Sequence, residues 1–170
     1  VTTTAYIALG SNLNDPRTQI EAGFRALAAL RSTRLAARSP SYRNRALGPE
    51  PQADFINAVA GLLTGLGPHQ LLDALQAIET AQGRERHAER WAPRVIDLDL
   101  LLYGDLQMRD GRLTLPHPEL INRRFVLQPL SDIAPELEIP GHGALRDLLK
   151  RAPAHELIEV SSIEPAVKIG

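Results

Sequence analysis

The sequence has 170 residues, of which 44% are apolar and 23% are charged, and it contains no cysteine. A chain of this length can bury one hydrophobic core, so we expect a single domain over residues 1–170, and the absence of cysteine excludes disulfides, thiolate metal sites and cysteine nucleophiles. The net charge of −1 argues against a general nucleic-acid binder and against a polybasic membrane surface.

The apolar residues follow two different periods along the first hundred residues. Four runs with the composition of buried strands predict strands at 4–9, 33–43, 55–64 and 95–103. Apolar residues at helical spacing predict two helices, the first opened by Asp15 and Pro16 and the second opened by Pro68 and closed by Gly83. Between the second and third strands, residues 44–54 form a loop that is long enough to be functional.

The predicted elements follow the order strand, helix, strand, strand, helix, strand, which is the arrangement of ferredoxin-like folds. We therefore expect an α+β sandwich with this βαββαβ core. The rest of the chain predicts additions to the same core, namely a hairpin at 106–115 and C-terminal helices at 121–133 and 144–151. The fold decides nothing about chemistry, because it hosts many functions.

Two aspartates on the fourth strand are the first candidates for chemistry. Asp97 and Asp99 are two residues apart, so both side chains leave one face of the strand, with their α-carbons about 7 Å apart. Two carboxylates this close repel each other unless a cation lies between them, and an all-oxygen ligand set suits Mg²⁺ completed by water and phosphate. Salt bridges to neighbouring arginines would explain the pair as well.

Arginine is concentrated just before that strand, where Arg84, Arg86, Arg90 and Arg94 surround Trp91. Guanidinium groups bind phosphate oxygens, so this stretch and the aspartates together predict a site for a metal–polyphosphate complex. An ordinary solvated loop with arginine and glutamate pairs is the alternative. A nucleotide would bind here without a Walker A loop or a G-x-G-x-x-G turn, since the sequence contains neither.

No targeting or membrane segment is predicted. The N-terminal residues carry no basic region before their short apolar stretch, and the low-charge stretch 55–72 is interrupted by Asn57, by glycines and by Pro68. We therefore expect a cytoplasmic protein.

Residues 90–101, with the sequence RWAPRVIDLDLL, closely resemble the signature of the 6-hydroxymethyl-7,8-dihydropterin pyrophosphokinase family. Further matches keep the family's order along nearly the whole chain, among them YIALGSN at 6–12, LGP at 47–49, FINA at 55–58, RLTLPH at 112–117 and IAPEL at 133–137. Their shared order and spacing make the resemblance specific. It implies transfer of the terminal diphosphate of ATP to the hydroxymethyl oxygen of the pterin, with release of AMP, in folate biosynthesis.

For the chemical step, the resemblance implies that Asp97 and Asp99 hold two Mg²⁺ ions and that Arg84 and Arg94 contact phosphate as catalytic groups. ATP is the co-substrate. The residues that the resemblance implies around the nucleotide are Gln76, Arg86, Trp91, Leu100, Arg112, Thr114, His117 and Arg123.

The resemblance also implies how the pterin is held. Its flat bicycle lies between two aromatic rings, at the positions of Phe55 and Phe125, and an amide at the position of Asn57 binds its edge. Asn44 and Leu47 supply neighbouring loop contacts. Packing in an ordinary core would explain both phenylalanines, whereas a buried amide in an apolar strand needs hydrogen-bond partners.

Two other functions share some of these features. A metal-dependent nucleotidyltransferase also pairs carboxylates on a strand, but it would release pyrophosphate rather than AMP. A module that binds single-stranded RNA can use a ferredoxin-like sheet, but Asp97 and Asp99 make that surface electrostatically wrong for RNA unless metal is present. We expect the pyrophosphokinase, a monomer that acts on ATP and the pterin and has no nucleic-acid or membrane partner.

Overall fold

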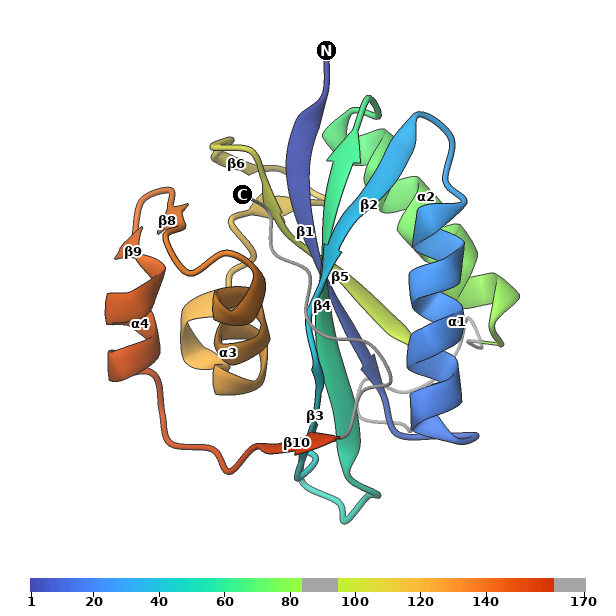
Figure 1. The fold of residues 1–170 in the computed structure, drawn as a ribbon, viewed down its shortest axis with the longest axis vertical. Coiled ribbons are helices and arrows are strands. Elements are labelled where there is room, and N and C mark those ends of the chain that lie inside the picture. The colour runs from blue at the N-terminus through green and yellow to red at the C-terminus, as the bar shows by residue number, and fades with distance from the viewer. Residues whose placement is uncertain (84–94, 161–170) are drawn as a thin grey trace.

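The computed structural model of the chain describes residues 1–83 and 95–160, which form three layers (Figure 1). Helices α1 (Pro16–Ala28) and α2 (Pro68–Ala81) cover one face of a central sheet. On the other face lies α3 (Arg124–Ile133), with α4 (Leu145–Arg151) packed against it. The strands of the antiparallel sheet are β1 (Thr3–Ser11), β2 (Thr33–Arg38), β3 (Ser41–Asn44), β4 (Phe55–Thr64), β5 (Asp97–Tyr103) and β10 (Ile158–Val160).

Shorter elements connect these layers. The additional hairpin is formed by β6 (Met108–Arg109) and β7 (Thr114–Leu115), and a second small pair is formed by β8 (Glu138–Ile139) and β9 (Gly143–Ala144). A 3₁₀ turn at Leu120–Asn122 precedes α3. Within the described ranges, no helix is long and apolar enough to cross a membrane.

The sheet has the order β10-β3-β4-β1-β5, with β2 also beside β4. This confirms the predicted α+β class and the βαββαβ order of the core. The predicted strand at 33–43 is two strands, because the pairing with β4 is interrupted at Ser39 and Pro40, between Arg38 and Tyr42. Pro40 has no backbone N–H to donate, and the side-chain hydroxyl of Ser39 accepts the backbone N–H of Val59 at 2.8 Å in place of a strand partner.

The ends of the first two helices test the predicted caps. Asp15 occupies the N-cap of α1, but its carboxylate accepts a hydrogen bond from the Thr18 hydroxyl at 2.7 Å and caps no backbone N–H. The position was therefore predicted correctly and the capping bond was not. Gly83 directly follows Gln82, the C-cap of α2, with a φ of 110° that other residues rarely adopt, so glycine ends this helix as predicted.

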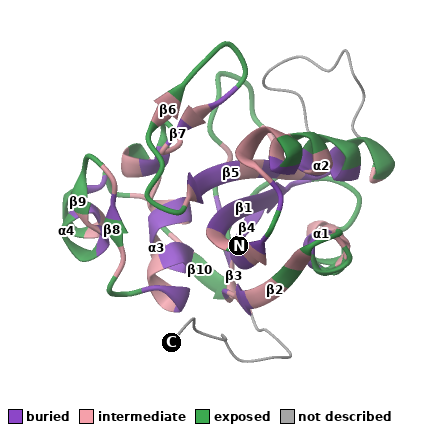
Figure 2. Cartoon of the chain, turned by 90° about the horizontal axis from the view of Figure 1, so that it is seen from above, coloured by how far each residue is buried: buried purple, intermediate pink, exposed green. Residues whose placement is uncertain are grey.

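The sheet separates two hydrophobic cores, because successive side chains of a strand point to opposite faces. Ile7 and Leu9 of β1 pack with Phe24 of α1 in the first core, between the sheet and α1 and α2. Tyr6 and Ala8 of the same strand belong to the second core, between the sheet and α3 and α4. Figure 2 shows the buried sheet between helices whose outer faces are exposed.

Polar contacts fix the position of α3 over the sheet. The Tyr42 hydroxyl of β3 donates a hydrogen bond to one carboxylate oxygen of Asp132, and Gln128 donates to the other at 3.2 Å. Burial, together with this hydrogen bond to Asp132, raises the pKa of Tyr42, so the hydroxyl keeps its proton and remains a donor. The last turn of α3, which carries Asp132, is thereby held at a defined place beside the sheet.

A second polar contact joins α1 to β2. Arg38 donates to both carboxylate oxygens of Glu21, and its guanidinium carbon lies 4.0 Å from the centroid of the Phe24 ring. Hydrogen bonding to Arg38 holds the pKa of Glu21 below its ordinary value. A lowered carboxyl pKa stabilises the fold above the unfolded-state pKa, and this stabilisation is lost as the pH falls through the folded-state pKa.

We therefore expect Glu21→Gln to lower the free energy of unfolding at neutral pH by about 0.5–1 kcal/mol, the range of solvent-screened ion pairs. The difference from the unsubstituted chain should shrink as the pH falls below about 4.3, the ordinary glutamate pKa. Urea denaturation across this pH range measures both effects. Glu138→Gln, at an exposed position of β8, is the matched control and should change nothing at either pH.

Candidate active site

The strand residues predicted for the site share one face of the sheet. Leu98 and Leu100 of β5 belong to the first core, so Asp97 and Asp99, which alternate with them, face the side that carries α3. Both aspartates are partly exposed. On the neighbouring strand β1, Gly10 lies in register with Asp97, so the strand neighbour of this carboxylate has no side chain.

The predicted pterin residues Asn57 and Asn44 lie on the same face, Asn57 two strands away from β5 on β4 and Asn44 three strands away on β3. Asn57 is buried, and its side-chain amide donates a hydrogen bond to the side-chain oxygen of Asn44. Asn44 in turn donates to the backbone oxygen of Arg45 at 3.1 Å. The buried amide of Asn57 thus has the hydrogen-bond partner that its burial requires. Phe55, the predicted stacking residue, is partly exposed and lies in register with Asn44.

Gly10 also belongs to this site, although the sequence did not predict it as a site residue. Its neighbour in register on β4 is Asn57, and a Cβ atom at Gly10 would lie 2.9 Å from Asn57 Oδ1 and 3.8 Å from the Phe55 ring. Any side chain here would displace the amide. The signal in the sequence is a glycine at the end of an otherwise apolar strand, which marks a close approach.

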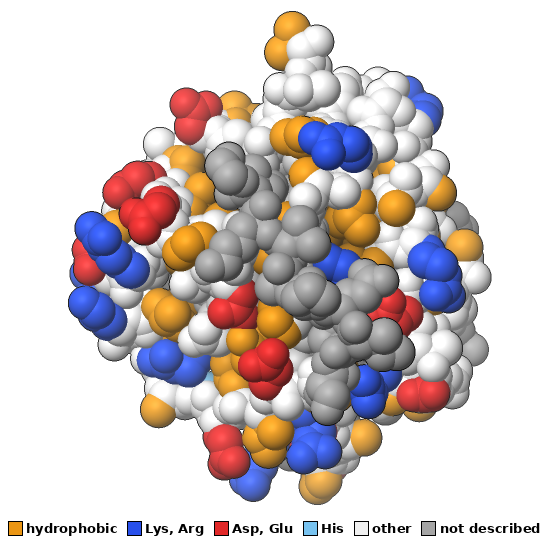
Figure 3. Space-filling view, viewed as in Figure 1, with side chains coloured by type: hydrophobic (Ala, Val, Ile, Leu, Met, Phe, Trp, Pro, Cys, Tyr) orange, Lys and Arg blue, Asp and Glu red, His pale blue; other side chains and the backbone are white. Residues whose placement is uncertain are grey.

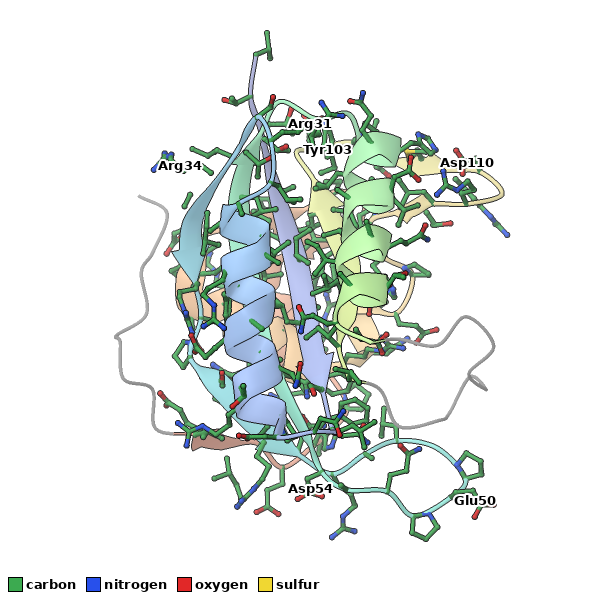
Figure 4. The ribbon with its side chains drawn as sticks, turned by 90° about the vertical axis from the view of Figure 1, so that its right-hand side faces the viewer. Arg31, Arg34, Glu50, Asp54, Tyr103 and Asp110 are labelled. Carbon is green, nitrogen blue, oxygen red and sulfur yellow. The ribbon has the colours of Figure 1, made fainter. Side chains whose placement is uncertain are left out.

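The loop 45–54 borders the same end of the sheet. Leu47, which we predicted as a pterin contact, is 52% exposed on it. Asn12, at the end of β1, donates hydrogen bonds to the side chain of Gln52 at 3.0 Å and to the backbone oxygen of Ala53 at 3.2 Å. In Figure 4, Glu50 and Asp54 mark this loop at the end of the sheet opposite Tyr103. Asn12 thus ties the loop to the strand that carries Gly10.

The start of α3 brings three predicted functions together. Arg123, predicted for the nucleotide, places its Nη1 atom 3.8 Å from Oδ2 of Asp99. Its guanidinium carbon lies 5.9 Å from the ring centroid of Phe125, the predicted stacking residue. Predicted metal, nucleotide and pterin residues therefore meet where β5 approaches the first turn of α3. Figure 3 shows one face of the molecule, viewed as in Figure 1, on which acidic and basic side chains are interspersed.

His117 lies beside the same group. Burial lowers its pKa, against the opposing effect of the nearby Asp99 carboxylate, so the imidazole is neutral at pH 7. Its Nδ1 atom accepts the backbone N–H of Glu119 at 3.1 Å, which assigns the proton to Nε2. The backbone N–H of His117 donates to the Leu101 oxygen at 2.9 Å, so β5 itself holds this residue in place. His117 therefore offers one neutral N–H donor to the site.

The other nucleotide candidates lie beside β5, on α2 and the β6–β7 hairpin. Arg112 donates hydrogen bonds to Gln76 at 3.3 Å and to Asp73 at 2.7 Å, and Thr114 is partly exposed on β7. The side chain of Leu100 is buried in the first core, so only its backbone is available to a ligand. The remaining predicted residues, Arg84, Arg86, Trp91 and Arg94, lie outside the described residues.

The donor set around β5 fits a hard divalent cation. Asp97 and Asp99 supply carboxylate oxygens from one face of one strand. Among the described residues, no group of three or more histidine, aspartate or glutamate side chains is placed to enclose a metal ion. A cation held by two carboxylates would complete its coordination with water and phosphate oxygens, which is how Mg²⁺ is bound at nucleotide sites.

Glu79 is a second residue that the sequence reasoning missed. This α2 side chain is 5% exposed, and one of its carboxylate oxygens accepts the backbone N–H of Leu98 at 2.9 Å. Leu98 stands between the two aspartates, so Glu79 fixes the backbone from which both project. Glutamate on an amphipathic helix normally faces water, and only the register of α2 against β5 reveals this role.

Comparison with known proteins finds one family and relatives that carry the same name. The sequence model of the family described as 7,8-dihydro-6-hydroxymethylpterin-pyrophosphokinase (HPPK) matches residues 6–135. A Haemophilus influenzae protein named 2-amino-4-hydroxy-6-hydroxymethyldihydropteridine pyrophosphokinase is 46% identical over 93% of this chain and 98% of its own length. A Pseudomonas aeruginosa protein of the same name is 51% identical over 87% of this chain and 91% of its own length.

Solved structures share the fold. The wild-type HPPK-DHPS protein of Plasmodium falciparum, solved with pteroate, superposes with a TM-score of 0.69 at 13% identity. The match covers 89% of this chain and 44% of the Plasmodium chain, so the chain studied here spans less than half of that larger protein. At this identity the likeness concerns the fold alone.

We expect Glu79→Ala to lower the free energy of unfolding by about 1–3 kcal/mol, because the buried Leu98 N–H loses its acceptor. Glu79→Gln keeps an oxygen at that place and should cost less than half as much. Urea denaturation at neutral pH measures both values. Glu119→Ala, at an exposed position, serves as the control. An alanine variant as stable as the unsubstituted chain would show that this hydrogen bond does not hold β5.

Proposed function

The chain belongs to the 7,8-dihydro-6-hydroxymethylpterin-pyrophosphokinase family, and we propose that it performs the reaction of this family with Mg²⁺ at the site described above. The reaction transfers diphosphate from ATP to the hydroxymethyl group of 6-hydroxymethyl-7,8-dihydropterin in folate biosynthesis. The observation that best supports this location is the meeting of Asp99, Arg123 and Phe125 at the start of α3.

The pterin binds at the end of the site formed by β3, β4 and the start of α3. Phe55 and Phe125 supply apolar rings for the two faces of the flat bicycle. Asn57 and Asn44, already joined by a hydrogen bond, present their remaining amide groups to the polar edge. Gly10 leaves the space that the amide of Asn57 occupies. These contacts orient the hydroxymethyl group toward the carboxylates of β5.

ATP binds along β5, α2 and the β6–β7 hairpin. Arg112 and Gln76 are solvent-accessible groups on the nucleotide side, and Arg123 brings a positive charge close to Asp99. Because His117 is neutral and holds its proton on Nε2, it donates to a phosphate oxygen without adding charge. From the sequence resemblance, we propose that Arg84 and Arg94 contact the phosphates and that Arg86 and Trp91 line the nucleotide side.

Asp97 and Asp99 would hold the Mg²⁺, two ions in our proposal, and the bound metal would supply charge neutralisation of the phosphates and a lower pKa of the attacking hydroxyl. In the overall reaction, a bond forms between the hydroxymethyl oxygen and the β-phosphorus. The bond from that phosphorus to the oxygen bridging the α- and β-phosphates breaks, AMP leaves, and the hydroxyl proton passes to solvent. Arg123 and His117 donate hydrogen bonds to the phosphates during this step.

Product analysis tests this function. Incubation of the protein with ATP, Mg²⁺ and 6-hydroxymethyl-7,8-dihydropterin should form AMP and pterin diphosphate in equal amounts, and omission of the pterin should suppress AMP formation. Chelation with EDTA should abolish turnover, and added Mg²⁺ should restore it. Free pyrophosphate as the product would instead indicate nucleotidyl transfer, and silence with this acceptor would contradict the proposal.

For Asp97→Ala and Asp99→Ala we expect turnover to fall about 10³-fold or more, because each variant removes a carboxylate that binds the metal. The melting temperature should change little, since both side chains are partly exposed. Asp105→Ala, at an exposed position just beyond the other end of β5, is the matched control and should keep full activity. Normal AMP formation by either site variant would overturn the metal assignment.

The proposal also covers the oligomeric state and the cellular location of the enzyme. We infer a single-domain monomer of 18.6 kDa that acts in the cytoplasm on small-molecule substrates. The sheet face on which RNA-binding modules stack bases carries α3 in this fold. Sedimentation of the purified chain, with and without substrates, tests the monomer directly.

A further inference from the structure

The chain returns to the pterin end of the site after α4. Residues 152–157 lead from α4 to β10, which pairs with β3 through Ile158 and Arg43, Glu159 and Tyr42, and Val160 and Ser41. On its other edge, β3 carries Asn44 beside Phe55. Residues 158–160 therefore extend the sheet beside β3, the strand that carries Asn44, and Figure 1 shows the chain passing below α4 and α3 to reach β10.

Two contacts fasten this segment to the start of α3. Arg124 donates hydrogen bonds to the backbone oxygens of Ala152 at 3.0 Å and Pro153 at 3.4 Å. Two residues further on, the His155 ring meets the Phe125 ring with a centroid distance of 5.5 Å and an interplanar angle of 88°. This is the favourable edge-to-face geometry of aromatic pairs. His155 is half-buried, so its ring is packed against the protein on the side of Phe125.

Phe125 needs such a contact because of its position. It lies in the first turn of α3 and is only partly buried against the second core. A ring in that situation loses rotamer freedom when a flat ligand stacks on it, and this loss weakens binding. A neighbour that already fixes the ring removes part of the loss. An edge-on neighbour also leaves a ring face available, whereas a stacked neighbour would cover it.

The segment lies outside the part of the chain that matches the family model, which ends at residue 135. The contact of His155 with Phe125 is therefore a feature of this chain that the family pattern does not describe.

We propose that His155 is a positioning residue for the pterin, and that segment 152–160 forms a wall of the pterin site. His155 holds the Phe125 ring edge-on, in the orientation in which the ring receives the bicycle. This inference rests on the proposed function, in which Phe125 is a stacking residue. It concerns the pterin alone, because the nucleotide residues Gln76, Arg112 and Thr114 lie beside β5 and away from the segment.

The test compares the dissociation constants of the pterin and of a non-hydrolysable Mg–ATP analogue. For His155→Ala we expect the pterin constant, measured with the analogue bound, to rise roughly two- to tenfold, the value of an edge-to-face aromatic contact. The constant of the analogue and kcat at saturating pterin should stay within about twofold. His155→Phe restores an aromatic edge and should recover the pterin affinity. His142→Ala, an exposed histidine in the β8–β9 turn, is the matched control.

A double-mutant cycle distinguishes positioning from general stability. Phe125→Leu removes the ring but keeps an apolar side chain, and in that background His155→Ala should have no further effect on pterin binding. An unchanged pterin constant for His155→Ala, an equal loss of nucleotide affinity, or additive effects in the double variant would each overturn the inference. AMP formation by the unsubstituted enzyme is measured in parallel. If AMP forms, any of these results contradicts only the role of His155. If no AMP forms, the proposed function itself fails, and with it the basis of this inference.

Discussion

The arrangement of the site depends on the strict alternation of side chains along the first residues of β5. Leu98 and Leu100 are fixed in the core beneath α1 and α2, which forces Asp97 and Asp99 to the opposite face. The alternation ends at a bulge, since Leu101 is skipped in the register with β1 and both Leu101 and Leu102 belong to the second core. The acidic residues are thus confined to the first three residues of β5, and Leu101 and Leu102 further along the strand pack into the second core.

The second layer completes the site because α3 covers only part of this face. The Tyr42–Asp132 hydrogen bond fixes α3 over β3, and the first turn of the helix then lies beside the aspartates. Contacts run without interruption from Asp99 to Arg123, from Arg123 to Phe125 and from Phe125 to His155. The proposed metal, phosphate and pterin regions are therefore parts of one continuous cluster.

Local patterns in the sequence were sufficient for the core of the fold. Strand β4 has the predicted bounds, 55–64, because a long apolar run pairs on both edges. The aspartate pair could be placed on one face, because strand alternation is a local property. Three features could not be predicted in this way: the break at Pro40, where a side chain replaces a backbone acceptor; Glu79, whose partner is 19 residues away; and β10, a three-residue strand defined only by its pairing with β3.

The electrostatics of the cluster explain how a nearly neutral chain can bind a highly charged ligand. Asp99 and Arg123 have opposite charges, and their side chains come within 3.8 Å of each other. His117 adds a donor without a charge. A site with both charges repels neither a cation nor a polyphosphate strongly. We therefore expect it to bind a metal–polyphosphate complex best, because the carboxylates can then bind the metal while the guanidinium binds the phosphate. Free nucleotide or free metal satisfies only one half of the site, so the bound complex of the two is favoured over either component.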